Sequence, residues 1–244
     1  MSEMINRFNQ PEANSEISFL NRRYLESIDE YNQLMPYYEA GIREINARLQ
    51  TLDRDFEVQH QHTPIHHIQS RIKTLPSAFR KLYKMGLNVS VTSAKKNLHD
   101  IAGVRVICCY TEDIQTIAKL LSEQEDIQII DVKDYINHPK PNGYRSLHLV
   151  VDVPIYLTRG KVFVKVEIQI RTVAMDFWAT LEHRIRYKST DQVPQFIVDE
   201  LKQCADVIAR TDERMQQISQ ELRRLNDSSE EYAWQSKAER SRNG

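Results

Sequence analysis

The sequence predicts an α+β protein in which a mixed β-sheet is flanked by N- and C-terminal helices. Apolar residues recur every three or four positions over residues 20–52 and again over 197–225, which is the period of an amphipathic helix. Between these stretches lie four short runs rich in β-branched residues, which are typical of strands: 103–110, 126–135, 146–153 and 161–170. The resulting order of strand, helix, strand, strand, strand, helix favours a mixed sheet with helices packed against it.

The N-terminal part is expected to contain two helices within residues 16–58, after a polar and mobile stretch at 1–15. Pro36 interrupts the helical period. Proline lacks the backbone N–H group that a helix interior needs, but it is favoured in the first turn of a helix. We therefore expect the second helix to begin near Pro36.

The central part, residues 59–192, is expected to form one domain. Thr111 is placed to cap a helix that runs to about Glu123, and Thr172 is placed to cap another helix that includes Trp178. Alternation along the last strand assigns two sets of side chains to opposite faces of the sheet: Val162, Val164, Val166, Ile168 and Ile170 on one, and Lys161, Phe163, Lys165, Glu167, Gln169 and Arg171 on the other. The first face can cover a core, and the second is either a functional surface or a solvated face.

Residues 193–226 are expected to form one long helix, followed by a polar, frayed tail at 227–244. The apolar residues of this helix are spaced by three and four positions over about four heptads, which is the pattern of a helix–helix seam. Self-association and packing within one chain both fit this seam. A scaffold protein assembled through the helix is one functional reading of it.

Composition excludes several classes of protein. The net charge is −1, so nucleic acid is not expected to bind through overall charge. The three cysteines, Cys108, Cys109 and Cys204, have no C-x-x-C spacing, which argues against a disulfide framework and a zinc site and favours a reducing compartment. The N-terminus lacks an apolar signal region, and no stretch reaches the ~20 apolar residues of a membrane span. We therefore expect a cytoplasmic protein without a membrane partner.

Two carboxylates are candidates for a metal site. Asp100 stands just before the first predicted strand, and Glu167 lies on the charged face of the last one. Magnesium is commonly held by one or two carboxylates together with substrate phosphates, so Asp100 and Glu167 could hold Mg²⁺ if folding brings them together. An aspartate before a strand is also a common turn residue.

Cations and a hydroxyl gather in the segment SRIKTLPSAFRKLYK at 70–84. Arg71 and Lys73 share a face if the first part is extended. If the second part is helical, the i, i+4 and i+7 spacing places Ser77, Lys81 and Lys84 on one face. Such a surface suits a triphosphate, although an ordinary charged helix would look the same.

The stretch HPKPNGYRSLH at 138–148 combines a broken loop with an aromatic ring and cations. Two prolines and Gly143 favour an irregular loop. The ring of Tyr144 can stack on a base, and alternation places it on the same face as His148. Lys140, Arg145 and His148 can meet phosphates or ribose, which a generic hairpin loop would not require.

Histidines suggest two further sites on weaker grounds. His99 and Asp100 look like the metal dyad of HD-type phosphohydrolases, but the other ligands of such a site are not present. The residues His60, His62, His66 and His67 could bind a transition metal, or they could be solvated side chains of a loop.

Five motifs in order resemble the synthetase domain of the RelA/SpoT family, and in particular the small alarmone synthetases: SRIKTLPS, HDIAGVRV, VKDYINHPKPNGYRSLH, VEIQIRT and AMDFWATLEHRIRYK. The match covers roughly residues 60–190. It implies a nucleotidyltransferase-like fold with a sheet of about five strands. It also implies a GTP pyrophosphokinase that transfers the β,γ-pyrophosphate of ATP to the 3′-hydroxyl of GDP or GTP, releases AMP, and makes the stringent-response alarmones ppGpp and pppGpp.

The resemblance implies roles for individual residues. Glu167 would be the base for the 3′-hydroxyl or a Mg²⁺ ligand, and Asp100 would hold Mg²⁺. Arg71 and Arg105 would sandwich adenine, while the ATP phosphates would be bound by Lys73, Ser77, Lys81 and Lys84. Tyr144 would stack on guanine and Asp176 would read its edge. The rest of the acceptor nucleotide would be bound by Lys140, Asn142, Arg145, His148 and Gln169.

The chain also departs from long members of the family. Their hydrolase and regulatory domains do not fit into 244 residues, so synthesis without hydrolysis is expected. Asp131 gives a DVKD tetrad that mixes the patterns associated with GDP and GTP preference, so the acceptor stays open. Small relatives suggest a homo-oligomer, with a tetramer expected. The alternative function is an inactive regulatory protein that binds nucleotide or single-stranded RNA through the same basic and aromatic residues.

Overall fold

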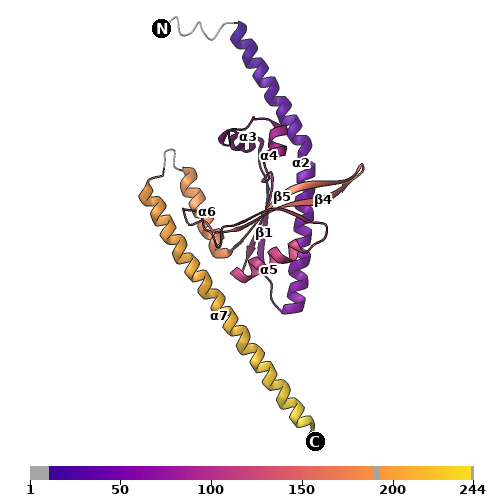
Figure 1. Cartoon of the computed structure of the whole chain (residues 1–244), viewed down its shortest axis with the longest axis vertical. Helices are drawn as coiled ribbons and strands as arrows, with labels where there is room; N and C mark the ends of the chain where they lie inside the picture. Colours follow the sequence, from indigo (N-terminus) through magenta and orange to yellow (C-terminus); the bar gives the residue numbers. More distant parts are fainter. Residues whose placement is uncertain (1–10, 189–192, 243–244) are drawn as a thin grey trace.

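The computed structural model describes the backbone of residues 11–188 and 193–242 and the side chains of 22–185 and 193–225. A twisted sheet lies at the centre and the long helix α2 (Pro11–His60) crosses it. The helices α6 (Val173–Lys188) and α7 (Gln195–Arg242) lie side by side to the left of the sheet (Figure 1). The expected α+β architecture is therefore confirmed.

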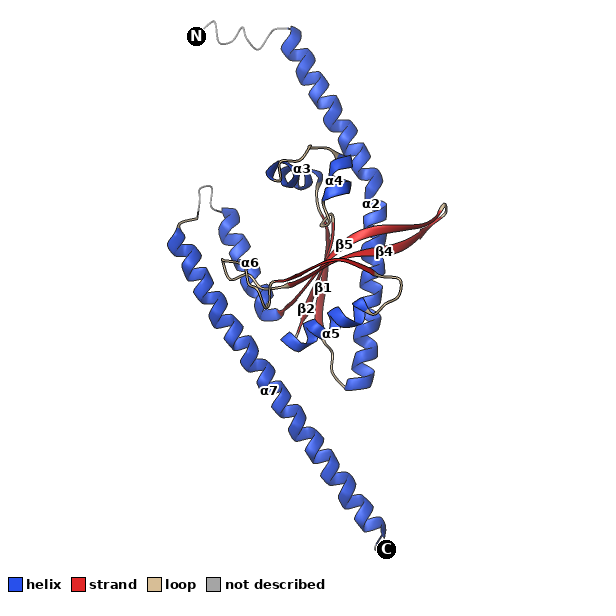
Figure 2. Cartoon of the chain, in the orientation of Figure 1, coloured by secondary structure: helices blue, strands red, loops and turns tan. Residues whose placement is uncertain are grey.

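The described residues form a sheet of five strands in the order β1-β2-β5-β4-β3. Figure 2 shows the strands in red. Its strands are β1 (Ile65–Ile72), β2 (Ala102–Cys108), β3 (Gln128–Asp134), β4 (Leu147–Leu157) and β5 (Gly160–Thr172). β2 and β5 run parallel, whereas the other neighbouring pairs are antiparallel. The sequence pattern missed β1, because its apolar residues Ile65, Ile68 and Ile72 are spaced like those of a helix.

The helix α2 (Pro11–His60) is continuous, so the expected division at Pro36 is wrong. Its residues Tyr31, Tyr38, Ile45 and Leu49 are buried in the core against the sheet. Each such side chain contributes about 1.5–3 kcal/mol on burial, and together they outweigh the roughly 3 kcal/mol that a proline costs inside a helix. The helix also begins inside the stretch 1–15 that was expected to be mobile, and residues 1–10 lie outside the described part.

Four shorter helices complete the described part of the domain: α3 (Leu75–Lys84), α4 (Val91–Asn97), α5 (Thr111–Ser122) and α6 (Val173–Lys188). Thr172 caps α6 as expected, because its Oγ1 accepts a hydrogen bond of 3.1 Å from the backbone N–H of Met175. Thr111 is the first residue of α5 rather than its cap. The turn before α5 is closed by Asp113, whose Oδ2 accepts a 2.9 Å bond from the N–H of Tyr110.

The C-terminal helix α7 (Gln195–Arg242) runs through the residues that were expected to form a polar tail. The helix continues there although residues 226–242 contain four serines, an asparagine and an aspartate, which have lower helix propensity than alanine or glutamate. The first part packs on α6, where Nε1 of Trp178 donates a 2.8 Å hydrogen bond to the carbonyl of Leu201.

The core lies on one face of the sheet. Val164, Val166, Ile168 and Ile170 of β5 are buried there with side chains from α2 and α5, as their alternation predicted. The helix α2 comes close to the sheet at Gly41, where a Cβ atom would lie 3.2 Å from Val166. The opposite face of β5 is left for polar side chains. Within the described residues, no helix has both the length and the apolar character needed to cross a membrane.

Candidate active site

Three polar side chains of β5 form the floor of the candidate site. Glu167, Gln169 and Arg171 alternate with core residues, so they leave the sheet on its polar face. Nε2 of Gln169 donates a 2.8 Å hydrogen bond to Oε2 of Glu167, and Nη2 of Arg171 donates a 2.8 Å bond to Oε1 of Gln169. Arg171 is only 2% exposed, so this row is a built site and not a solvated face.

The neighbouring strand β4 adds a histidine, and the loop before it adds a tyrosine. His148 is paired with Gln169 in the antiparallel register, and its Nδ1 lies 3.4 Å from Oε1 of Glu167. The hydroxyl of Tyr144 lies 2.9 Å from Nε2 of His148 and accepts a 3.0 Å bond from Nη2 of Arg171. Tyr144 and His148 therefore share one face, as predicted, and a chain of hydrogen bonds links them to Glu167.

The environment of Glu167 keeps its carboxyl group ionised. Burial alone would raise its pKa, but the hydrogen bond and charge of His148, the hydrogen bond from Gln169 and the charge of Lys81 outweigh burial and lower the pKa to about 2. Glu167 therefore stays negatively charged at neutral pH, which suits a side chain that binds a metal cation.

Asp100 lies at the end of two lysine side chains from the preceding segment. Its Oδ2 is 3.0 Å from Nζ of Lys73 and 2.8 Å from Nζ of Lys81. Lys73 follows β1 and Lys81 lies on α3, so two segments converge on this carboxylate. The hydroxyl of Tyr31 on α2 donates a 2.7 Å bond to the carbonyl of Lys73, and burial, together with the nearby charges of Tyr38 and Asp100, raises the pKa of Tyr31 to about 12.

Arg71 and Arg105 flank an open slot on the neighbouring strands β1 and β2. In the antiparallel register, Arg71 is opposite Gly103 and Arg105 is opposite Gln69. A Cβ atom at Gly103 would meet Cγ of Arg71 at 3.6 Å, so the arginine lies flat over the glycine backbone. The adenine sandwich between these two side chains stays a prediction.

A polar cleft of about 530 Å³ continues from this slot toward α6. It is lined by most of the side chains that were expected to bind the acceptor, namely Lys140, Asn142, Tyr144, His148 and Gln169, together with Arg71 and Arg105. Nζ of Lys140 lies 4.8 Å from the centre of the Tyr144 ring, and Nδ2 of Asn142 donates a 3.0 Å bond to Oε1 of Glu182.

Other expected site residues have different surroundings. Arg145 points toward α7, where its Nη2 lies 3.5 Å from Oδ1 of Asp206, and it does not line the polar cleft. Oδ1 of Asp176 lies 3.4 Å from both Arg105 and Arg171. Ser77 accepts a 2.9 Å bond from the Thr74 hydroxyl, and Lys84 is exposed at the end of α3.

The residues of the site that sequence reasoning missed include Tyr31, Tyr135, Arg171 and Glu182. Arg171 belongs to the charged row that alternation identified, so that pattern already contained a signal for it. Tyr135 packs edge-on against His148 with 5.2 Å between ring centres. Tyr31 and Glu182 come from distant helices, and their positions depend on tertiary packing that no local pattern contains.

The site fits a magnesium ion. Oδ1 of Asp100 is buried and has no hydrogen-bond partner among the described residues, while the lysines occupy Oδ2. The parallel register places Glu167 beside Gly103, close to where the segment after Asp100 enters the sheet. Within the described residues, no group of three or more metal-binding side chains exists, so an ion here would need further ligands from substrate phosphates.

The histidines near the N-terminal end of the domain do not assemble into a metal centre. His60 ends α2 and packs on Phe56, His62 lies 2.7 Å from Asp113, and His66 and His67 belong to β1. The same survey of the described side chains finds no metal-binding group here. The hypothesis of a histidine metal site therefore has no support in the fold.

Comparison with known proteins agrees with this geometry. A family model for the region found in RelA and SpoT proteins matches residues 70–192. The chain is 43% identical over 191 residues to the GTP pyrophosphokinase YwaC of Bacillus subtilis, a match that covers 78% of this chain and 90% of the relative. It is 35% identical over 189 residues to the GTP pyrophosphokinase YjbM of the same organism, covering 78% and 88%.

Solved structures of the same class have this fold. Small alarmone synthetase 1 of B. subtilis bound to its product pppGpp superposes with a TM-score of 0.72 at 33% identity, covering 79% of this chain and 97% of that one. Small alarmone synthetase 2 of B. subtilis gives a TM-score of 0.69 at 42% identity, covering 75% and 96%. The chain therefore belongs to the RelA/SpoT family and is similar over most of its length to the small alarmone synthetases of that family.

Proposed function

We propose that this chain is a (p)ppGpp synthetase that transfers the β,γ-pyrophosphate of ATP to the 3′-hydroxyl of GDP or GTP. The observation that carries the proposal is a pair of carboxylates that share a cationic neighbour: Asp100 is paired with Lys73 and Lys81, and the charge of Lys81 also acts on Glu167. The relatives named as GTP pyrophosphokinases, and the small alarmone synthetases solved with pppGpp and with AMPCPP, support this assignment.

The donor nucleotide is assigned to the side of the cleft built from β1, β2 and α3. Adenine fits the slot between Arg71 and Arg105, and the lysines at 73 and 81 neutralise the phosphates. Phosphoryl transfer needs charge neutralisation and in-line positioning more than covalent help from the protein, and this set of side chains provides both. Ser77 and Lys84, which are both exposed on α3, are also proposed to bind the phosphates.

The acceptor nucleotide is assigned to the side built from β4, β5 and α6. A guanine base stacked on Tyr144 takes the place of the Lys140 ammonium, which lies 4.8 Å from the ring centre in this structure. Asn142, His148 and Gln169 then line the ribose and phosphates. Asp176 remains the proposed reader of the guanine edge, although reaching it requires release of one of its two arginine partners.

The reaction breaks the bond between the β-phosphorus and the oxygen that bridges it to the α-phosphorus. The 3′-oxygen of the acceptor bonds to the β-phosphorus, AMP leaves with the bridging oxygen, and the 3′-hydroxyl loses its proton. General bases work best with a pKa near the operating pH, so the pKa of about 2 favours Glu167 as the ligand of a metal cation over the role of base, and the proton of the 3′-hydroxyl passes to water. Bound Mg²⁺, held by Asp100, Glu167 and the phosphates, would supply charge stabilisation to the transferred group.

The assignment is tested by following label from the terminal phosphate of ATP in the presence of GTP and Mg²⁺. Labelled pppGpp together with AMP supports it, and binding of both nucleotides without any product supports the regulatory alternative. A protein that only bound anions would gain nothing from two carboxylates at the phosphates, which is why the enzyme is favoured.

Self-association is a separate proposal based on α7. Several large apolar side chains along this helix are more than half exposed: Val207, Met215, Ile218, Leu222 and Leu225. A homo-oligomer, with a tetramer as the expected state, would cover them. Light scattering on the full chain and on a chain ending near Pro194 tests this, and an unchanged mass per particle would contradict it.

Two further expectations remain proposals. The enzyme would act in the cytoplasm, where its nucleotide substrates are. Single-stranded RNA would compete with the acceptor for the same basic and aromatic side chains. Its bases can stack on exposed aromatic rings, and its phosphates can pair with the cationic side chains.

A further inference from the structure

The N-terminal half of α7 contacts the loop that carries Tyr144. Gly143 has φ +89°, and a Cβ atom at this position would lie 2.5 Å from Cβ of Ala205 and 3.4 Å from Cα of Lys202. The loop backbone therefore rests directly on the helix, without a side chain between them. A positive φ and a close approach together require glycine here.

The two residues that follow Gly143 are also held by this helical layer. Tyr144 packs against the buried cluster of Trp178, Ala179 and Ala205. Arg145 turns away from the cleft, and its Nη2 lies 3.5 Å from Oδ1 of Asp206. Three consecutive loop residues thus contact α6 and α7, and the middle one is the proposed guanine platform.

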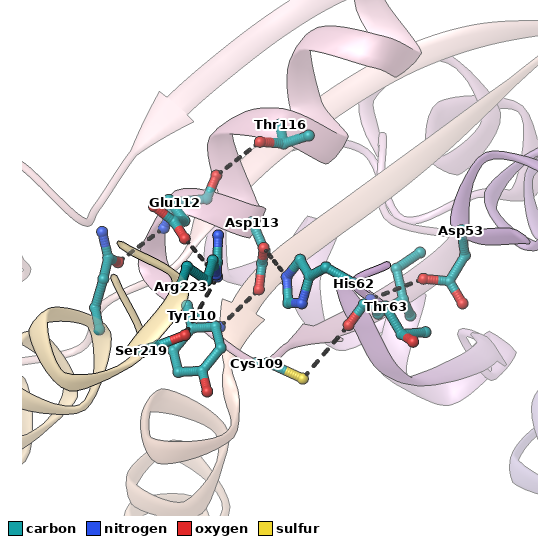
Figure 3. A network of polar contacts seen from close by, with 12 residues as sticks. Asp53, His62, Thr63, Cys109, Tyr110, Glu112, Asp113, Thr116, Ser219 and Arg223 are labelled. Atoms are coloured by element: carbon teal, nitrogen blue, oxygen red, sulfur yellow. Dashed lines mark hydrogen bonds and ion pairs between the residues drawn. The ribbon is translucent and has the colours of Figure 1, made fainter. Parts of the chain in front are cut away.

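α7 also forms hydrogen bonds and an ion pair with the rest of the domain further along its length. Asp212 is buried and accepts a hydrogen bond from the hydroxyl of Thr172 at the end of β5. Further along, Oε1 of Gln216 accepts a 3.0 Å bond from the N–H of Glu112 at the start of α5, and Arg223 forms a 2.8 Å ion pair with the Glu112 carboxylate. Figure 3 shows Arg223 and Glu112 facing each other across this junction.

We propose that α7 is a part of the acceptor site, in which Ala205 and Asp206 are positioning residues that hold the loop of Gly143, Tyr144 and Arg145 in its binding geometry. The inference rests on the proposed synthetase function and deepens it. It assigns Arg145 to the helix contact and not to the nucleotide. Among the described elements, α7 packs chiefly on α5 and α6, whereas the donor side of the cleft is built from β1, β2 and α3. The helix therefore sets the affinity for the guanine nucleotide and leaves ATP binding unchanged.

The first test enlarges Ala205. Ala205→Val pushes the loop away from the helix, and we expect the KM for GTP to rise about tenfold, which is within the range that one base-stacking contact contributes. We expect kcat and the KM for ATP to stay within about twofold of the wild-type values. Cys204→Val places the same side chain at the exposed neighbouring position and should leave all three constants unchanged. A folded Ala205→Val protein with an unchanged KM for GTP, or with both KM values raised equally, overturns the proposal.

The second test reverses the charges of the ion pair. Asp206 is half exposed, so Asp206→Arg is compatible with folding and should raise the KM for GTP about threefold, as expected for a pair near the surface. The double variant with Arg145→Asp should recover most of the affinity. If it is no better than Arg145→Asp alone, Arg145 contacts the nucleotide and its assignment to α7 is wrong.

Calorimetric titration with GTP separates this inference from the function on which it rests. If the wild-type protein makes no pppGpp, the proposed function fails, but the affinity for GTP still reports on the helix. Weaker GTP binding by Ala205→Val and equal binding by Cys204→Val would then keep α7 as a positioning element. Equal binding by both variants would remove it.

Discussion

The Nζ atom of Lys81 lies 2.8 Å from Oδ2 of Asp100, and the same positive charge acts on the carboxyl group of Glu167. Two carboxylates that are far apart in the chain therefore share one cationic neighbour on α3. Oδ1 of Asp100 is buried and has no hydrogen-bond partner among the described residues, so it is the oxygen that we propose would bind the metal ion.

Replacement of the strand carboxylate tests its role. Glu167→Gln keeps the shape and the bond from Gln169 but removes the charge, so we expect kcat to fall by about a hundredfold or more while ATP still binds. Asp152→Asn is a matched control, because Asp152 is paired with Lys165 on the neighbouring strand and has no proposed role. Steady-state assays of both variants check this, and near-normal turnover by Glu167→Gln would refute the role.

The lysines of α3 should differ in their effects. Lys81 contacts Asp100, whereas Lys84 is exposed one turn further on. Lys81→Ala should raise the KM for ATP about tenfold, in line with the loss of one charge-assisted contact, and Lys84→Ala should raise it less. Equal effects of the two variants would show that the phosphates extend further along the helix than we propose.

The ring and the hydroxyl of Tyr144 have separable functions. Tyr144→Ala removes the stacking surface and should cost about 1–3 kcal/mol in binding of GTP, with little change for ATP. Tyr144→Phe keeps the ring and loses only the bonds to His148 and Arg171. Calorimetric titration with GTP should rank wild type, Phe and Ala in that order, and unchanged affinity of the Ala variant would exclude stacking on this ring.

The buried carboxyl group of Asp212 predicts a pH dependence of stability. Burial raises its pKa above the ordinary value, against the opposing effect of the Thr172 hydroxyl. A raised pKa favours folding while the group is protonated, and this contribution is lost as the pH rises through the folded pKa. An amide at this position does not titrate and can still accept the Thr172 bond, so Asp212→Asn should gain stability relative to wild type between pH 4 and pH 7.

Urea unfolding of both proteins at the two pH values measures this difference directly. The remaining titratable groups are shared by the two proteins, so their effects cancel in the comparison. A free-energy difference that stays constant between pH 4 and pH 7 would contradict the assigned direction of the Asp212 pKa.

Four of the five described strands, and the face that Tyr144 and His148 share, could be predicted from the sequence because their information is local. Alternation along β5 separated the core residues from Glu167, Gln169 and Arg171, and the loop chemistry at 138–148 identified Tyr144 and His148. Both signals depend on the two-residue period of a strand and on side-chain chemistry, which the sequence contains in full.

The features that the sequence could not indicate are those decided by packing. Pro36 has the local signature of a helix start, but burial of the same helix against the sheet overrides it. Arg145 has the chemistry of a phosphate ligand, but the carboxylate it meets, Asp206, belongs to a helix much later in the chain. Local composition cannot tell which of two possible partners a cation will meet.

The account is tested most directly by incubating the full-length protein with ATP labelled at the γ-phosphate, GTP and Mg²⁺, and separating the products by thin-layer chromatography. We predict labelled pppGpp and AMP in equal amounts, with about a hundredfold less of both from Glu167→Gln. AMP without a labelled guanosine product, or equal product from the wild-type and Glu167→Gln proteins, would contradict the claim that these two carboxylates direct pyrophosphoryl transfer.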